Sequence, residues 1–535
     1  MPELTENIKE REFITALGER VFKGLLSEFE EFSGLSLNSL QQNRIETELS
    51  FLEAEFFGGL DKSYTLAKKT SAGEFHNKAR VRYYNNEMDE KLKLLSEKWP
   101  RSANVFVIGG LLFKNHVAGI KNLYGFDDDG GAVIDVLGSA TSIALGAHNP
   151  YVSIFDRVED MLQIRDNICT PYHPGIRQAF FLEKISKLYP GDSSQVVIHS
   201  ESSGAVVDSI AIESALAFIE KRTHSTEGRI LAVDGTWAGG YGAAREATGF
   251  GVDSFTMKRL KKNLHIDRCL PSPTKENAKE FLSILKNKTD EGAAAGLYLE
   301  ADIVGDSGIE LVERELLCET LSILGRHKLP VIADCVQQLG RTGGYWGENV
   351  ESLLKNYPWL ILTTAKSASN GLPFAYTIMP KEIAEAVNPL THISTNQFNG
   401  PLLRAIAVSE IMSDEAFQNF INAKGKIIEE SAEKHGTPLG VKGLRGKFMN
   451  RSVYVGSNDN VKLMQIALLV EDGILIGALP KSLRYQPMLL EYSKTNELVA
   501  DVIFRRVNQV MKGNITKTVE EVFNTMKGVD SGLAR

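Results

Sequence analysis

Short apolar runs alternate with amphipathic stretches between residues 103 and 400. The runs at 329–335 and 359–365 are typical of strands buried on both faces, and 205–222 has helical spacing. Strands that alternate with helices favour an α/β fold with a mostly parallel sheet that helices cover on both faces. The predicted strands are 104–110, 195–200, 229–235, 295–301, 329–335 and 359–365, and the predicted helices include 205–222 and 311–327.

The segments on either side have a different pattern. Residues 13–32 and 89–99 carry apolar side chains at helical spacing, which predicts an N-terminal helical extension over 1–102. This extension has no catalytic motif, so we expect a role in packing or oligomerisation. After residue 401 long helical stretches precede short strand-like pieces, which indicates a smaller α+β domain. The predicted division is 1–102 extension, 103–165 N-terminal part of the small domain, 166–400 large domain and 401–535 C-terminal small domain.

Charge and cysteine content exclude several classes of protein. The chain has 60 Lys and Arg against 68 Asp and Glu, a net charge of −8, which argues against a general nucleic-acid binder. The first residues, MPELTENIKERE, lack the apolar core of a signal peptide, and no apolar run approaches the ~20 residues of a membrane span. The four cysteines are scattered and form no CxxC pair, so we expect neither disulfides nor a metal site. This cysteine usage predicts a cytoplasmic location.

Polar residues follow the predicted strands. In parallel α/β sheets, ligands bind beyond the carboxyl ends of the strands, so residues at these positions are candidates for a common site. They are residues 200–204, Trp237, Glu300, Asp334 and Lys366.

Two of these residues suggest a specific chemistry. A lysine at a strand end is usually only solvated, but a desolvated amine can attack a carbonyl and form a Schiff base, which is how Lys366 could act. Asp334 ends a run that should be buried, so its carboxylate needs a partner. It is either a hydrogen-bonded strand-end aspartate or an acid held against the protonated ring nitrogen of pyridoxal phosphate.

Two further segments follow strands. Residues 200–214 read as a strand end, a Ser/Gly turn and a helix start, which predicts either a phosphate site at the helix N-terminus or an ordinary serine cap. Trp237 could stack on a flat cofactor or belong to the core.

In this order, the segments resemble the class III (ω-type) aminotransferases, pyridoxal-phosphate enzymes of fold type I. The resemblance implies a large domain with a mostly parallel seven-stranded sheet. The resemblance covers about residues 123–490. The motifs that carry it are 122–152, the turn SSGA at 202–205, TWAGG at 236–240, ADCVQQLGRTGG at 333–344, TTAKSASNGLP at 363–373 and HISTNQFNGP at 392–401.

The resemblance implies how the cofactor would be held. Lys366 would be the Schiff-base lysine, and Asp334 would pair with the pyridine nitrogen. Val336 would pack under the ring, opposite Trp237, and Gln337 would contact the phenolic oxygen of the cofactor.

The phosphate would be bound from two subunits. Thr395, with Ser394 beside it, would donate to the phosphate of the neighbouring subunit's cofactor, which implies a homodimer with shared active sites. The donors within the subunit would be Ser202, Ser203, Gly204 and Ala205.

The residues on the substrate side depart from the family pattern. Arg484 would bind a substrate carboxylate, since a guanidinium suits that group. Glu300 matches the first acid of a family motif and would also belong to the substrate site. The second acid of the family motif is Asp306 here, with one residue inserted. Ala238 and Cys335 replace a histidine and an acid of the family, which suggests an uncommon substrate or reaction.

The implied function is an aminotransferase that moves an amino group between an amino acid or amine and a keto acid or aldehyde. Two alternatives stay open. One is a racemase, aminomutase, decarboxylase or lyase of the same fold, and the other is a non-catalytic relative that acts as a binding protein.

Overall fold

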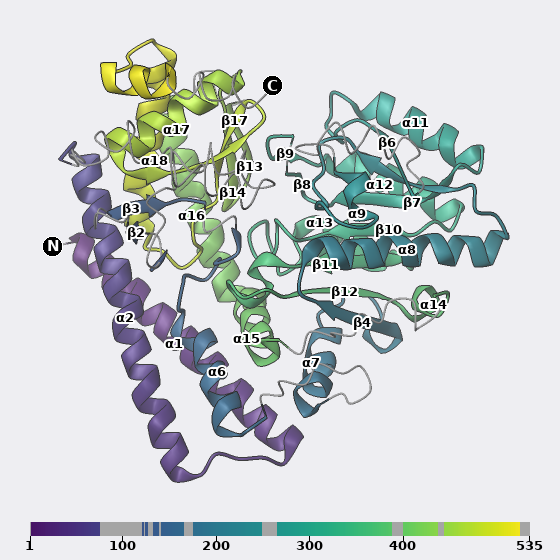
Figure 1. Ribbon diagram of the computed structural model, residues 1–535, viewed down its shortest axis with the longest axis horizontal. Helices are drawn as coiled ribbons and strands as arrows, with labels where there is room; N and C mark the ends of the chain where they lie inside the picture. The colour runs from purple at the N-terminus through teal and green to yellow at the C-terminus, as the bar shows by residue number, and fades with distance from the viewer. Residues whose placement is uncertain are drawn as a thin grey trace, which may run out of the picture.

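A seven-stranded sheet forms the centre of the computed structural model, in the order β4-β12-β11-β10-β7-β5-β6. β12 runs antiparallel to both of its neighbours, and the other strands run in one direction. The predicted mostly parallel α/β sheet is therefore confirmed (Figure 1). The strands are β4 (Val196–Glu201), β5 (Arg229–Val233), β6 (Ile266–Leu270), β7 (Ala294–Glu300), β10 (Val331–Asp334), β11 (Leu360–Thr364) and β12 (Ala375–Pro380).

The structure describes residues 2–74, 120–121, 124–126, 132–137, 141–164, 175–248, 265–305, 307–387, 400–436 and 443–524. The predicted strand at 104–110 and the predicted helix at 89–99 lie outside these residues. β6 was not predicted, because in this edge strand only the two end residues are fully buried and the apolar run is short.

The register of three central strands brings polar residues to one edge. Asp334 at the end of β10 lies opposite Glu300 on β7 and Thr363 on β11. Laterally paired residues of a sheet point to the same face. These three side chains therefore share a face at the carboxyl edge, where the predicted site should lie.

Helix α8 (Gly204–Thr223) lies across this sheet and packs against β4, β5, β7, β10, β11 and β12 (Figure 1). Its buried residues occur on nearly every side, as expected of a helix enclosed by other elements. Helices α11 (Ala278–Asp290) and α12 (Arg314–Arg326) pack on each other. The predicted start of α12 at residue 311 was too early, since Leu311 belongs to β9 (Glu310–Leu311).

Two long N-terminal helices, α1 (Pro2–Ser33) and α2 (Ser39–Ser71), pack against the rest of the molecule (Figure 1). Asn38 and Gln41 form a capping box that fixes the start of α2. These two helices pack against the helices α6 (Pro150–Met161), α7 (Ile176–Ser186), α15 (Leu402–Ser413) and α18 (Ser493–Met511), and α2 also contacts β3 (Ala132–Asp135).

The C-terminal part contains a four-stranded antiparallel sheet in the order β13-β14-β17-β16. In a separate sheet, β15 (Ile474–Leu475) pairs in parallel with β3 (Ala132–Asp135), so segments far apart in sequence lie side by side. The elements of this part are α16 (Glu415–His435), β13 (Leu444–Lys447), β14 (Asn450–Tyr454), α17 (Asn458–Asp472), β16 (Gly477–Leu479) and β17 (Ser482–Tyr485). The remaining short elements are β1 (Ile120–Lys121), β2 (Tyr124–Phe126), α9 (Ala244–Ala247), β8 (Ile303–Val304), α13 (Glu348–Ser352) and α14 (Lys381–Ala384).

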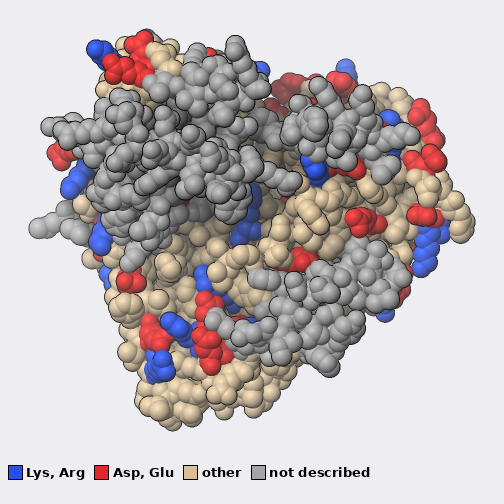
Figure 2. Space-filling model, in the orientation of Figure 1, with Lys and Arg blue, Asp and Glu red and all other residues tan. Residues whose placement is uncertain are grey.

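Acidic and basic side chains are interspersed on the described surface that faces the viewer in Figure 2. Within the described ranges, no helix is both long enough and apolar enough to cross a bilayer.

The contact between α1 and α6 yields a stability prediction. A Cβ atom at the buried Gly18 would lie 2.0 Å from Tyr151 Cδ2, and the Tyr151 hydroxyl donates to Glu53 Oε1 on α2 at 2.8 Å. We expect Gly18→Ala to lower the free energy of unfolding by ~1–3 kcal/mol through overpacking. A Cβ atom at Gly24, on the same helix, would meet no packing partner within 4 Å, so Gly24→Ala should instead raise that free energy by ~0.5–1 kcal/mol. Urea unfolding of both variants checks this, and equal effects would contradict the packing of α1 on α6.

Candidate active site

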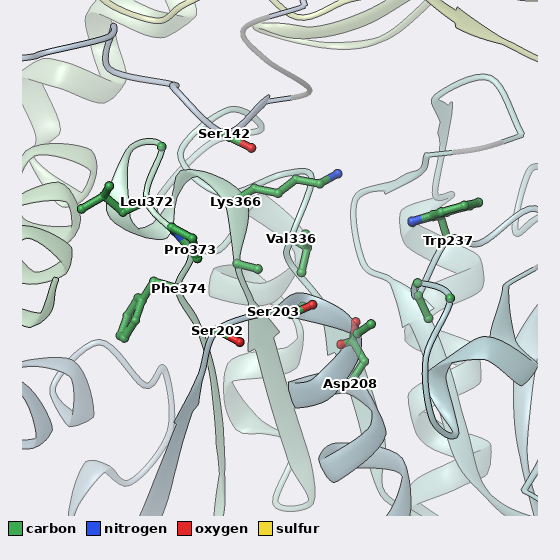
Figure 3. A pocket seen from close by; sticks show the side chains of 17 residues that line it. Ser142, Ser202, Ser203, Asp208, Trp237, Val336, Lys366, Leu372, Pro373 and Phe374 are labelled. Carbon is green, nitrogen blue, oxygen red and sulfur yellow. The ribbon is translucent and has the colours of Figure 1, made fainter. Parts of the chain in front are cut away.

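A cavity of about 500 Å³ lies beyond the carboxyl ends of β4, β5, β10 and β11. Seven of the predicted site residues line it, and Figure 3 shows how its side chains lie. The lining consists of Ser142, Ser202, Ser203, Gly204, Ala205, Asp208, Trp237, Ala238, Gly239, Gly240, Val336, Ala365, Lys366, Gly371, Leu372, Pro373 and Phe374.

Lys366 directly follows β11 and begins the 3₁₀ helix η4 (Lys366–Ser369). Its φ is +47°, in the left-handed region that a side chain other than glycine rarely adopts. Such a conformation costs about 1–3 kcal/mol and is concentrated at functional sites. The side chain extends across the cavity in the direction of Trp237 (Figure 3).

The loop after Lys366 is held by hydrogen bonds that fix this conformation. The Asn370 side chain accepts from Leu145 N at 2.9 Å and donates to Gly146 O at 2.8 Å. The Arg404 guanidinium donates to the carbonyl oxygens of Ser369 at 3.0 Å and Asn370 at 3.2 Å. The small residues of 363–373 thus belong to a turn that hydrogen bonds hold in place. Asn370 joins this turn to residues 145–146, which belong to the motif at 122–152.

Asp334 is 1% exposed and lies at the end of β10. Its Oδ2 accepts from the Tyr298 hydroxyl at 2.7 Å, and its Oδ1 accepts from Val336 N at 2.8 Å. Burial raises the pKa of Asp334, while these two hydrogen bonds and the positive charge of Lys366 act in the opposite direction. A cationic group in the cavity would therefore favour the ionised form of this acid.

The start of α8 offers an anion site. Ser203 is the N-cap residue but makes no side-chain cap hydrogen bond, and both Ser202 and Ser203 are exposed to the cavity. The first backbone N–H groups of a helix have no partner within the helix, so they and the two hydroxyls can bind a phosphate. A Cβ at Gly204 would lie 3.2 Å from Ala365 Cβ, so this turn lies against the residue before Lys366.

Trp237 and Val336 lie on different sides of the cavity, with the Lys366 side chain reaching between them (Figure 3). Trp237 is 36% exposed. Gly239 has φ +111°, and a Cβ there would lie 2.5 Å from Ala205 Cβ. The segment after Trp237 therefore lies directly on the start of α8, where a larger residue would not fit.

Four predicted residues do not line this cavity, and the buried Asp334 described above is one of them. Glu300 accepts from Gly305 N at 2.7 Å. A Cβ at Gly305 would lie 2.7 Å from Gln337 Nε2 and 2.8 Å from Glu300 Oε1, so both side chains pack around this glycine instead. Arg484 is on β17, buried in the C-terminal sheet, where it pairs with Ser452 on β14.

Ser394, Thr395 and Asp306 lie outside the described residues.

Two buried side chains at this site were missed in the sequence. Asp208, on the second turn of α8, lines the cavity although only 1% of it is exposed, and Tyr298 holds Asp334 from β7. A carboxylate within the apolar run VVDSIAI was the available signal for Asp208. The sequence predicted a helix for Asp208 but no role at the site, because helical periodicity alone does not show which elements surround a residue.

The donor set fits pyridoxal phosphate. Lys366 offers an amine for the aldehyde, Asp334 a buried acid for the ring nitrogen, and the start of α8 an anion site for the phosphate. The described residues hold no cluster of three His, Cys, Asp or Glu side chains that could bind a metal ion.

Comparison with known proteins agrees with this assignment. The acetylornithine aminotransferase of Methanopyrus kandleri is 25% identical over 347 residues, which cover 63% of this chain and 80% of that enzyme. The isoleucine 2-epimerase of Lentilactobacillus buchneri is 24% identical over 344 residues, 61% of this chain and 72% of that enzyme. The match to the mitochondrial acetylornithine aminotransferase of Candida glabrata is shorter, 31% identical over 163 residues, and spans 30% of this chain and 37% of that enzyme.

A solved structure and a family model cover more of the chain. The crystal structure of the ornithine aminotransferase from Toxoplasma gondii matches with a TM-score of 0.61 at 16% identity, over 80% of this chain and 100% of that one. The predicted fold type I is thereby confirmed. Residues 115–505 match the model of the class-III aminotransferases. The chain therefore belongs to the class III aminotransferases, pyridoxal-phosphate-dependent enzymes of fold type I.

Proposed function

We propose that Lys366 carries the cofactor of this class III aminotransferase as a Schiff base, and that the enzyme moves an amino group from an amino acid or amine to a keto acid or aldehyde. The observation that carries this proposal is the position of the Lys366 amine. It extends into the cavity from a strained turn, and its charge acts on the buried Asp334. An amine beside a buried carboxylate suits a carbonyl nucleophile that must also move a proton.

The remaining residues would hold pyridoxal phosphate by distinct interactions. The first N–H groups of α8, with the Ser202 and Ser203 hydroxyls, would bind the phosphate. Asp334 would face the ring nitrogen, and Trp237 and Val336 would cover the two faces of the ring. When bound, the cofactor supplies an electron-withdrawing ring that stabilises negative charge on a substrate carbon.

Lys366 has a second role once a substrate amine has replaced it. Its Nζ atom is then a neutral amine in a small cavity, where it would take the proton from the substrate carbon that bears the amino group. The same nitrogen would return the proton to the cofactor carbon rather than to the substrate carbon. Asp334, ionised, would keep a proton on the ring nitrogen throughout.

A racemase or epimerase is the second candidate, since the isoleucine 2-epimerase of Lentilactobacillus buchneri is among the relatives. In that reaction, the proton returns to the carbon it left, on the other face. One measurement separates the two reactions. With an amino donor and no acceptor, an aminotransferase releases one keto product per site and stops, whereas an epimerase continues to invert the donor.

We also propose a cytoplasmic homodimer whose sites are shared through Ser394 and Thr395. The free cysteines Cys269, Cys318 and Cys335 support a reducing compartment. We retain the division into extension 1–102, small-domain parts 103–165 and 401–535, and large domain 166–400. The pairing of β15 with β3 supports joining the two small-domain parts.

Replacing the lysine tests the central role. We expect Lys366→Ala to lower kcat by at least ~10² fold, because it removes the group that moves the proton. The variant should still bind pyridoxal phosphate reversibly through the phosphate site, as measured by equilibrium dialysis. The exposed Lys355 provides the control, and Lys355→Ala should leave kcat unchanged. Wild-type turnover by Lys366→Ala would contradict the proposal.

Mixing two inactive variants tests the shared site. Lys366→Ala and the double variant Ser394→Ala, Thr395→Ala each damage a different half of a shared site. If sites are shared, random exchange of subunits gives heterodimers with one intact site, and recovers roughly a quarter of the wild-type activity. No recovery, with exchange confirmed by native mass spectrometry, would show that these residues act within their own subunit.

The predicted carboxylate site is tested at Arg484. A lysine keeps the charge but not the two parallel hydrogen bonds of a guanidinium, so Arg484→Lys should raise KM for a keto acid by about tenfold with little change in kcat. An unchanged KM for both an acid and an aldehyde acceptor would exclude this role. The variant's melting temperature serves as the control for damage to the β13-β14-β17-β16 sheet.

A further inference from the structure

Trp237 belongs to the segment 237–244, which we call the Trp237 loop and which connects β5 to α9. The Trp237 side chain is 36% exposed, whereas Ala238, Ala243 and Ala244 are buried. The indole lies at one side of the cavity (Figure 3). A side chain with this much exposed surface is only partly fixed by its own packing. Its position at the cavity therefore depends on how the backbone of the Trp237 loop is held.

One side chain of α8, Ser209, bonds to both ends of the segment 241–244. Ser209 is 7% exposed and lies on the second turn of the helix. Its Oγ atom accepts from Ala244 N at 3.1 Å. The same hydroxyl lies 2.7 Å from Ala205 O and 3.1 Å from Tyr241 O, and its single proton is shared between these two carbonyl oxygens. Ser209 thus connects the Trp237 loop to the first turn of α8.

Two glycines let the Trp237 loop come this close to the helix. Gly242 has φ +58°, and a Cβ there would lie 2.4 Å from Ser209 Oγ. Gly239 packs in a similar way on Ala205, which lies one helical turn before Ser209. The loop and the helix therefore meet along two successive turns of α8.

Further hydrogen bonds hold the chain at α9 and just after it. Thr248, which is 0% exposed, donates to Gly239 O at 2.6 Å and so joins the end of α9 to the Trp237 loop. Glu246 on α9 accepts from His265 N at 2.9 Å, beside β6. Of these three anchors, Ser209 is the one that comes from α8.

The helix that carries Ser209 also begins at the proposed phosphate site. The first turn of α8, which starts at Gly204, lies directly before the turn that carries Ser209. The phosphate of the cofactor and the indole that would cover its ring are thus both held by α8. A bound cofactor makes both contacts at once, so the attachment of the loop to the helix decides how well the indole meets the ring.

We propose that Ser209 is a positioning residue that holds the Trp237 loop on α8, so that one helix fixes both the phosphate site and the Trp237 indole. Ser209 does not line the cavity, so it acts through Trp237 rather than on the cofactor itself. The effect on the cofactor rests on the proposed function, in which Trp237 covers one face of the pyridoxal phosphate ring.

Ser209→Ala is the informative variant, because it removes the hydroxyl and keeps a strong helix former at this position. Thr223, in the last turn of α8, provides a matched control. Its hydroxyl also donates to the carbonyl oxygen four residues earlier, Ile219 O at 2.8 Å, but at the opposite end of the helix from the Trp237 loop.

The first test measures hydrogen exchange in cofactor-free protein by mass spectrometry. In Ser209→Ala, the amides of residues 237–248 should exchange at least about tenfold faster than in wild type, because the loop loses its bonds to the helix. Peptides of β10 and β11 should keep their wild-type rates, and Thr223→Ala should keep the wild-type rate in 237–248. Unchanged exchange of 237–248 in Ser209→Ala, or an equal acceleration throughout the sheet, would overturn the proposal.

The second test asks whether Ser209 acts through Trp237, and it uses protein loaded with pyridoxal phosphate. Ser209→Ala should raise the dissociation constant of the cofactor by about three- to tenfold and change the circular dichroism of the bound cofactor, because the indole is no longer held against the ring. In protein that already carries Trp237→Ala, the same substitution should change neither quantity. Full additivity of the two substitutions would overturn the proposal.

The Trp237→Ala variant separates this inference from the proposed function. If Trp237→Ala bound the cofactor with the dissociation constant and circular dichroism of wild type, the proposed stacking of Trp237 would be refuted. The exchange rates of residues 237–248 in cofactor-free Ser209→Ala would then still decide whether Ser209 holds the loop.

Discussion

The proposed site depends on one buried acid, Asp334. A carboxylate in the interior is costly unless hydrogen bonds and a cation compensate it. Here Tyr298 and the Val336 amide supply the hydrogen bonds, and the positive charge of Lys366 also favours the ionised form of Asp334. Tyr298 on β7 and Lys366 after β11 lie near Asp334 because β7, β10 and β11 run in parallel and in register, so their carboxyl ends meet at one edge of the sheet.

Rigid packing around the cavity keeps these groups in place. The turn that carries Lys366 is held to residues 145–146 by Asn370 and to α15 by Arg404. Gly239 lets the segment after Trp237 meet the start of α8 at a distance that a Cβ atom would not permit, and Gly204 packs closely on Ala365. Helices α1 and α2 pack on α6, and α1 also packs on α15, which contacts the 3₁₀ helix η4 that begins with Lys366. Preorganised groups of this kind need little rearrangement when charge develops during a reaction.

The sequence predicted most of the sheet because its inner strands are continuous apolar runs, as at 329–335 and 359–365. It missed two strands of this sheet, β6, whose edge position leaves no such run, and β12, which runs antiparallel to its neighbours. At the site, the order of motifs predicted a cavity shared by Lys366 and Trp237, and the structure places both in its lining. Glu300 and Arg484 matched motifs, yet neither lines the cavity: Glu300 packs at Gly305, and Arg484 is buried on β17. The position of Asp208 at the cavity could not be predicted, because it depends on how α8 packs on the strands of the sheet.

The central claim is that Lys366 is the lysine that binds the cofactor covalently. The most direct measurement is reduction of the wild-type protein, loaded with pyridoxal phosphate, by borohydride, followed by peptide mapping by mass spectrometry. Reduction makes a Schiff base permanent, so the modified lysine can be identified. We predict one modified peptide, with the cofactor on Lys366. Stoichiometric modification of a different lysine, or none at all in protein that has bound the cofactor, would contradict the account.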